Sequence, residues 1–115
     1  PDGGLITTLA DFAKWSRIFS GGDQTILSQD SIDLMSSPKI AIGNGGPLDS
    51  MGYGLFVGDR LIGHGGLIVG FSSQFVFDRE SRSLIAVFSN DAGGNPQQVT
   101  FGLLTLLLTP GSRPK

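Results

Sequence analysis

The chain has 115 residues, including 18 glycines and no cysteine, and its 8 basic and 10 acidic side chains give a net charge of −2. This length supports a single domain over residues 1–115, and the weakly acidic balance argues against nucleic acid as a partner. The lack of cysteine excludes disulfides and cysteine nucleophiles, one histidine cannot form a zinc site alone, and we expect neither a membrane span nor a signal peptide.

Two helices are predicted in the first third of the chain. Thr8 and Asp11 have the spacing of a capping box, and apolar residues then recur with a helical period. We therefore expect a helix over residues 9–20 that ends at a pair of glycines. A second, shorter helix should begin after Ser28, whose hydroxyl can cap it, and should end before Pro38.

Antiparallel strands are predicted in the middle of the chain. Residues 39–52 are rich in glycine and lack a clear period, so we expect a surface loop there. Residues 53–57 and 60–63 are predicted to be a pair of short strands, with the second running into His-Gly-Gly. Residues 71–78 alternate between two faces and should form a hairpin with residues 83–90 across a charged turn.

The chain is predicted to end in an apolar helix and a frayed tail. Asn95 and Pro96 have the residue types of an N-cap and a first helical position, and a leucine-rich segment follows them. Residues 110–115 are expected to form a flexible tail. The predicted fold is therefore α+β, with two N-terminal helices, an antiparallel sheet of three to four strands, and a C-terminal helix packed on the sheet.

This arrangement predicts an incompletely covered sheet. We expect Phe71, Phe75 and Phe77 to be buried under the last helix, because they lie on one face of their strand. The other face of the sheet and the first two helices would then need a further surface to pack against. The sequence thus predicts a missing partner surface.

Several segments resemble parts of a known family. The segment from Gly63 to Phe71 reads Gly-His-Gly-Gly-Leu-Ile-Val-Gly-Phe and predicts a strand that ends at His64, with glycines that permit close backbone approach. This segment and four others occur in the order seen in the C-terminal part of the serine β-lactamase and penicillin-binding-protein superfamily; the others are residues 3–11, 27–28, 53–55 and 77–90. The chain most resembles the class C-like branch, which includes esterases and D-amino-acid-specific peptidases. Together the segments cover nearly the whole chain, and no single motif carries the resemblance.

The resemblance implies an acyl-hydrolase with a serine nucleophile, and it places His64-Gly65-Gly66 at the Lys-Thr-Gly-type strand that faces the serine. It implies that His64 positions or polarises the substrate, that Gly66 lets the acyl group lie against the strand, and that the backbone N–H of Leu67 is one of two oxyanion donors. Histidine replaces lysine and glycine replaces threonine, which weakens the anchor for a β-lactam carboxylate. We therefore expect ester or D-peptide substrates. Without the resemblance, His64 would be interpreted as a partly exposed histidine at a strand end.

The nucleophile and its base are not evident in the chain. Ser-x-x-Lys occurs at Ser36 and at Ser112, but each copy has a proline just before its lysine and neither opens an apolar helix. No Tyr-x-Asn motif is present. A triad of Ser72, His64 and Asp78 is possible by residue type alone.

The first functional hypothesis is therefore a C-terminal fragment of a β-lactamase-like serine hydrolase that is inactive by itself. Its partners would be a small acyl substrate (an ester, a D-peptide or a β-lactam) and the missing N-terminal part of the enzyme or a second copy of the chain. The alternative is a non-catalytic interaction or complementation module that binds another chain through an exposed sheet face. A processing fragment of an intact enzyme differs from the first hypothesis only in its history. No cofactor is implied, and relatives are often exported.

Overall fold

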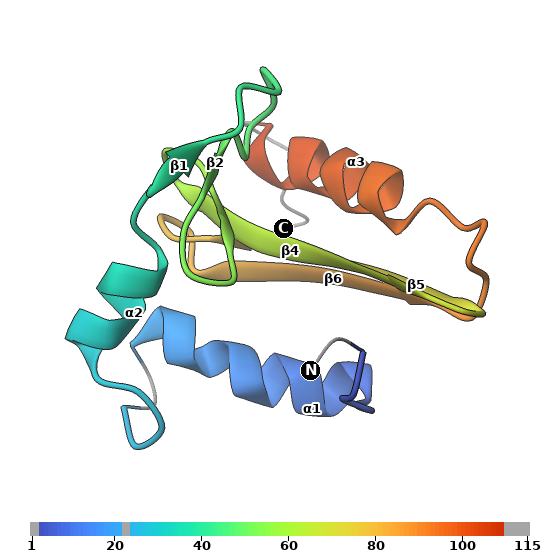
Figure 1. Ribbon diagram of the computed structural model, residues 1–115, viewed down its shortest axis with the longest axis horizontal. Helices are drawn as coiled ribbons and strands as arrows, with labels where there is room; N and C mark the ends of the chain where they lie inside the picture. Colours follow the sequence, from blue (N-terminus) through green and yellow to red (C-terminus); the bar gives the residue numbers. More distant parts are fainter. Residues whose placement is uncertain (1–2, 22–23, 110–115) are drawn as a thin grey trace.

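The computed structural model describes residues 3–21 and 24–109, which form one antiparallel sheet with helices on both sides (Figure 1). Its six strands follow one another in chain order across the sheet, from β1 to β6. The elements are α1 (Leu9–Trp15), the 3₁₀ helix η1 (Ser16–Ser20), α2 (Gln29–Met35), β1 (Ile40–Ala41), β2 (Ser50–Met51), β3 (Phe56–Val57), β4 (Leu61–Ile68), β5 (Phe71–Asp78), β6 (Ser83–Ser89) and α3 (Pro96–Leu108). The predicted α+β class, with two N-terminal helices and a C-terminal helix on an antiparallel sheet, is confirmed.

All three helices begin at the predicted caps. The side chains of Thr8, Ser28 and Asn95 accept hydrogen bonds from the backbone N–H groups three residues later. The capping box is only half formed, because the Asp11 carboxylate accepts from the Thr8 hydroxyl at 2.9 Å instead of from its backbone N–H. The first helix narrows to 3₁₀ geometry at Ser16 and ends at Gly21, whose φ of 72° is left-handed.

The sheet is wider than the expected three to four strands, because three two-residue strands extend it at one edge. The predicted loop over residues 39–52 contains two of them, β1 and β2, which pair with each other. The predicted strand over residues 53–57 is reduced to β3, since Gly54 has a φ of 72° and breaks the extended backbone. The expected end of a strand at His64 is also wrong. β4 continues to Ile68, because it stays paired with β5 along its whole length.

Two cores lie on opposite faces of the sheet. Under α1, η1 and α2, the buried side chains of Ile18, Phe19 and Ile32 pack with Phe75 and Phe77. On the other face, the core consists of Leu48, Leu61, Val76 and Leu104 of α3. The consecutive residues Phe75, Val76 and Phe77 of β5 place apolar side chains on both faces of the sheet, so this segment needs a helix over each face.

The predicted burial of three phenylalanines under the last helix is therefore wrong. Phe75 and Phe77 pack under the first helical layer, where the rings of Phe12 and Phe75 lie 5.1 Å apart in an edge-to-face arrangement. Phe71 is 57% exposed at the start of β5. Because α1 and α2 occupy the face that was expected to be bare, the inference of a missing partner for that face is corrected.

The predicted flexible tail, residues 110–115, lies outside the described residues. Among the helices of the described part, none combines the length and the apolarity that crossing a membrane requires.

Candidate active site

The edge of β4 is open beyond its first three residues. β3 pairs with β4 only at Ile62 and Gly63, and within the described ranges no strand lies beside the rest of β4 on that side. The N–H and C=O groups of successive residues in an antiparallel strand point alternately to its two sides. Two hydrogen bonds at the start of β4 show which residues point toward β5 and which point toward β3. Arg60 accepts from Arg79 on the β5 side at 2.9 Å, and Leu61 accepts from Gly58 on the β3 side at 2.8 Å.

This alternation determines which groups face the open edge. Counting in steps of two from Leu61, the N–H and C=O groups of Gly65 and Leu67 point away from β5 and toward the open edge. The backbone N–H of Leu67 is thus a fixed donor directed out of the sheet. The resemblance assigned the oxyanion role to this N–H group, and the fold leaves it available for that role.

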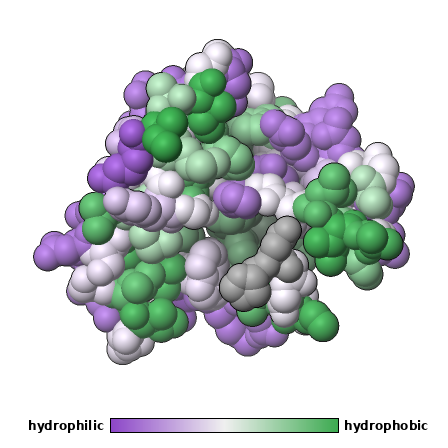
Figure 2. All heavy atoms as spheres, in the orientation of Figure 1, coloured by the Kyte–Doolittle hydropathy of each residue, from purple (hydrophilic) through white to green (hydrophobic). Residues whose placement is uncertain are grey.

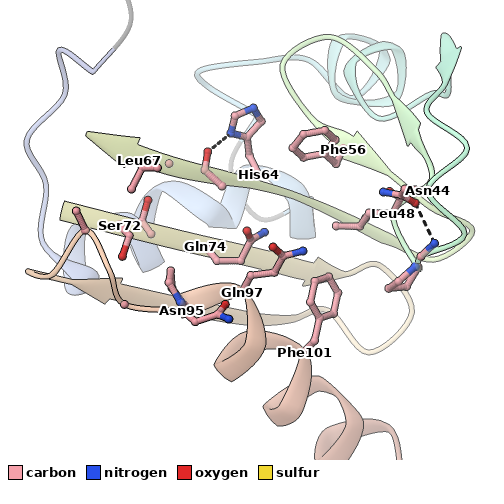
Figure 3. A pocket seen from close by; sticks show the side chains of 18 residues that line it. Asn44, Leu48, Phe56, His64, Leu67, Ser72, Gln74, Asn95, Gln97 and Phe101 are labelled. Atoms are coloured by element: carbon pink, nitrogen blue, oxygen red, sulfur yellow. Dashed lines mark hydrogen bonds between the residues drawn. The ribbon is translucent and has the colours of Figure 1, made fainter. Parts of the chain in front are cut away.

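His64 lies at the same edge (Figure 3). Its exposed ring stacks on Phe56 with a centroid distance of 5.1 Å and an interplanar angle of 20°. Its Nδ1 is 2.5 Å from the carbonyl oxygen of Gly65. A carbonyl oxygen can only accept, so Nδ1 carries the hydrogen of this bond, and Nε2 of the neutral ring is left as an acceptor.

A cavity of about 590 Å³ lies beside this edge, over the face of the sheet that α3 covers. The loop before β2, strands β3 to β5 and the start of α3 surround it. Leu48, Phe56 and Phe101 form an apolar end, and Gln74 and Asn95 contribute amide groups (Figure 3).

The four residues named from the sequence, His64 to Leu67, all line this cavity. The structure thus places these residues at one cavity, and the chemical roles that the resemblance implies for them remain predictions.

The glycines of this segment lie close to β5; a side chain at Gly63 would meet backbone, whereas side chains at Gly65 and Gly66 would require neighbouring side chains to move. A Cβ at Gly65 would lie 2.9 Å from Oε1 of Gln74, and a Cβ at Gly66 would lie 2.6 Å from Oγ of Ser73. A Cβ at Gly63 would lie 2.4 Å from the backbone oxygen of Phe75. The glycines thus let β4 approach the side chains and backbone of β5 closely.

The other lining residues could not be found from sequence motifs. Phe56, Gln74 and Phe101 come from three segments that the fold brings to β4. The one available signal was Gln74, a polar residue directly before the apolar residues 75–77, which is only 8% exposed in the structure.

The candidate serine pairs do not form catalytic arrangements among the described residues. Ser36 caps the end of α2, and its buried hydroxyl has no hydrogen-bond partner, while Lys39 lies over the ring of Tyr53 at 5.6 Å. This supports the interpretation of that Ser-x-x-Lys as a chance match. The second copy, at Ser112, lies outside the described residues.

The triad possible by residue type is not assembled. The hydroxyl of Ser72 donates to the backbone oxygen of Asp91 at 2.8 Å, and Nδ1 of His64 is bonded to Gly65. Asp78 is fully buried and binds the guanidinium of Arg60, with a distance of 2.8 Å from Nε to Oδ1. This guanidinium is the main reason that the pKa of Asp78 is lowered from 3.8 to about 2. Asp78 is therefore a structural anchor for the end of β5.

Comparison with known proteins agrees with the resemblance noted in the sequence. The family model described as Beta-lactamase matches residues 1–107, which is most of the chain. No curated protein matches the chain. The chain therefore belongs to the Beta-lactamase family.

Proposed function

We propose that this chain forms one wall of the active site of a serine acyl-hydrolase that cleaves ester, D-peptide or β-lactam bonds. The observation that carries the proposal is the open edge of β4, where the N–H of Leu67 points outward beside His64 and a cavity. Membership of the Beta-lactamase family supports a hydrolase reaction on acyl compounds. The class C-like branch remains part of the proposal and rests on the sequence resemblance.

In this proposal, the nucleophile comes from residues beyond these 115, because neither Ser-x-x-Lys in the chain opens a helix. The serine oxygen forms a bond to the substrate carbonyl carbon, and the carbonyl oxygen gains negative charge. The N–H of Leu67 donates to that oxygen, a contribution typically worth about 2.7–4 kcal/mol of barrier. The bond between the carbonyl carbon and the leaving group breaks, and the leaving group takes up the proton that the serine hydroxyl has given up. Water then hydrolyses the acyl-enzyme, which releases the acid and restores the serine hydroxyl. The serine belongs to an N-terminal part of the same enzyme or to a second copy.

His64 is proposed to position the substrate at the edge of β4. Its ring is held by Phe56 on one side and by the Gly65 carbonyl at Nδ1, so Nε2 has a fixed direction. A fixed acceptor can hold an N–H or O–H of the substrate against the strand at little entropic cost.

A turnover assay tests the proposal. The chain alone and the product of the complete reading frame that contains it are each incubated with p-nitrophenyl butyrate. We expect turnover only by the longer product. With the p-nitrophenyl ester of N-acetylalanine, whose N–H can donate to His64, we expect His64→Ala to lower kcat/KM of the longer product about tenfold, which is the cost of one lost hydrogen bond. Turnover by the chain alone that is abolished by Ser36→Ala would contradict the proposal.

A second candidate function, a module that binds another chain, is favoured by a different surface from the one predicted. Helices cover both sheet faces, but apolar side chains gather where β4 turns into β5, at the right-hand end of Figure 2. Leu67, Val69 and Phe71 are 71%, 98% and 57% exposed there. Absence of turnover by both proteins would favour this second candidate.

A further inference from the structure

The described residues that line the cavity beside β4 come from five segments and include no Asp, Glu, Lys or Arg. The chain has 18 such residues, so their absence from this lining distinguishes the cavity from the rest of the surface. Among the described lining residues, His64 has the one imidazole side chain.

The lining offers neutral hydrogen-bonding groups instead. Gln74 is 8% exposed, and its Nε2 donates to the backbone oxygen of Phe75 at 3.2 Å. This single bond leaves the other N–H of the amide and its Oε1 to pair with a ligand. Gln97, on the first turn of α3, also lines the cavity. The side-chain amides of Gln74 and Gln97 and the backbone of Gly65 and Gly66 thus all line the cavity.

The other end of the cavity is apolar. Leu48 is 6% exposed, and the rings of Phe56 and Phe101 are half-buried. An aromatic or branched aliphatic group placed there would remove apolar surface from water on both sides, at about 25 cal/mol per Å². The cavity therefore has a place for an apolar group at one end and for an amide or ester near Gln74.

We propose that this cavity selects uncharged acyl compounds with an apolar side group, and that it rejects substrates with a free carboxylate. A carboxylate in the cavity would lose part of its hydration and would meet no Lys or Arg among the described residues that line it. This inference rests on the proposed function and narrows it. It favours neutral esters and blocked peptides over β-lactams, which carry a carboxylate.

Two probes that differ by one methyl group test the inference. The isotope-labelled chain is titrated at pH 8 with N-acetylphenylalanine methyl ester and, separately, with N-acetylphenylalanine, and binding is followed by NMR chemical shifts. We expect the ester to shift the backbone amides of Gly65 and Leu67 and the side-chain amide of Gln74. We expect the acid to bind at least about tenfold more weakly.

A matched pair of variants tests the cause of the selectivity. Gln97 lines the cavity, whereas its neighbour Gln98 does not, and both side chains are exposed. Gln97→Lys places a cation at the cavity and should bring the affinity for the acid to within about threefold of that for the ester. Gln98→Lys adds the same charge outside the cavity and should leave the preference for the ester unchanged.

Three results would overturn the inference: equal affinity for the two probes, shifts confined to other residues, or equal gains in affinity for the acid in both lysine variants. These results are distinguishable from failure of the proposed function. Selectivity for the ester without any hydrolysis by the longer product would count against the function and leave the neutral cavity standing. Hydrolysis by the longer product of p-nitrophenyl butyrate and of the p-nitrophenyl monoester of succinic acid, which carries a free carboxylate, at equal kcat/KM would overturn only the inference.

Discussion

Replacing Leu67 by proline is expected to lower kcat of the complete enzyme by about 100- to 1,000-fold, the usual cost of losing one oxyanion donor. Proline has no backbone N–H, so the change removes the proposed donor itself. The fold should tolerate it, because this N–H faces the open edge of β4 and makes no bond to β5. The measurement is steady-state hydrolysis of p-nitrophenyl butyrate, with urea denaturation of the same protein as a check on folding.

Leu67→Ala is the matched control. It removes a side chain that is 71% exposed but keeps the backbone N–H, so kcat should stay within about threefold of the original. Ile68→Pro tests the assignment of alternate N–H groups to the two sides of β4. The N–H of Ile68 faces β5, so its loss should lower the stability of the fold. Equal activities for Leu67→Pro and Leu67→Ala, in proteins of equal stability, would remove Leu67 from the oxyanion role.

Asp78→Asn is expected to give the largest loss of stability of any single polar substitution in the described fold. The carboxylate is fully buried and pairs with Arg60, and it also accepts from the hydroxyl of Ser81 and the backbone N–H of Glu80. Removing the carboxylate of Asp78 leaves the guanidinium with only the exposed carboxylate of Glu80 as a counter-charge. We expect the free energy of unfolding in urea to fall by about 3 kcal/mol.

The pH dependence gives a second signature of Asp78. Its pKa lies near 2 in the folded chain, below the ordinary value of 3.8. Its contribution of roughly 2 kcal/mol is therefore fully present above about pH 4 and is lost as the pH falls through 2. Asp78→Asn should lack this part of the acid transition.

Glu80→Gln is the control, because Glu80 also pairs with Arg60 but its side chain is 68% exposed. This substitution should lower the free energy of unfolding by less than about 1 kcal/mol. Similar losses for both variants would contradict a structural role specific to Asp78.

The features of the fold that depend on local sequence were predictable. The caps at Thr8, Ser28 and Asn95 involve contacts between residues three apart in the sequence. β5 begins and ends where predicted, because its side chains alternate clearly between two faces. The layer that covers each face was not predictable. Alternation along β5 shows that Phe75 and Phe77 share a face, but it cannot show whether α1 or α3 covers them. The two-residue strands β1 and β2 are defined by their pairing partners and have no periodicity to detect.

The candidate site was predictable only where it is contiguous in sequence. The segment from His64 to Leu67 could be named because its residues are neighbours and resemble a family motif. Its continuation as a strand was missed, because two glycines give no sign of the pairing that extends β4. Phe56, Gln74 and Phe101 reach the cavity through tertiary structure, and no local pattern relates them to His64.

The central claim, that this chain is an active-site wall whose nucleophile lies elsewhere, is tested most directly by locating the acyl group in the enzyme. The product of the complete reading frame is incubated with a slowly deacylating p-nitrophenyl ester, digested, and mapped by tandem mass spectrometry. We predict one acylated serine outside these 115 residues, at a helix-opening Ser-x-x-Lys, and no adduct when the chain is treated alone. An acyl group on Ser36, or on any other serine of the chain, would contradict the account.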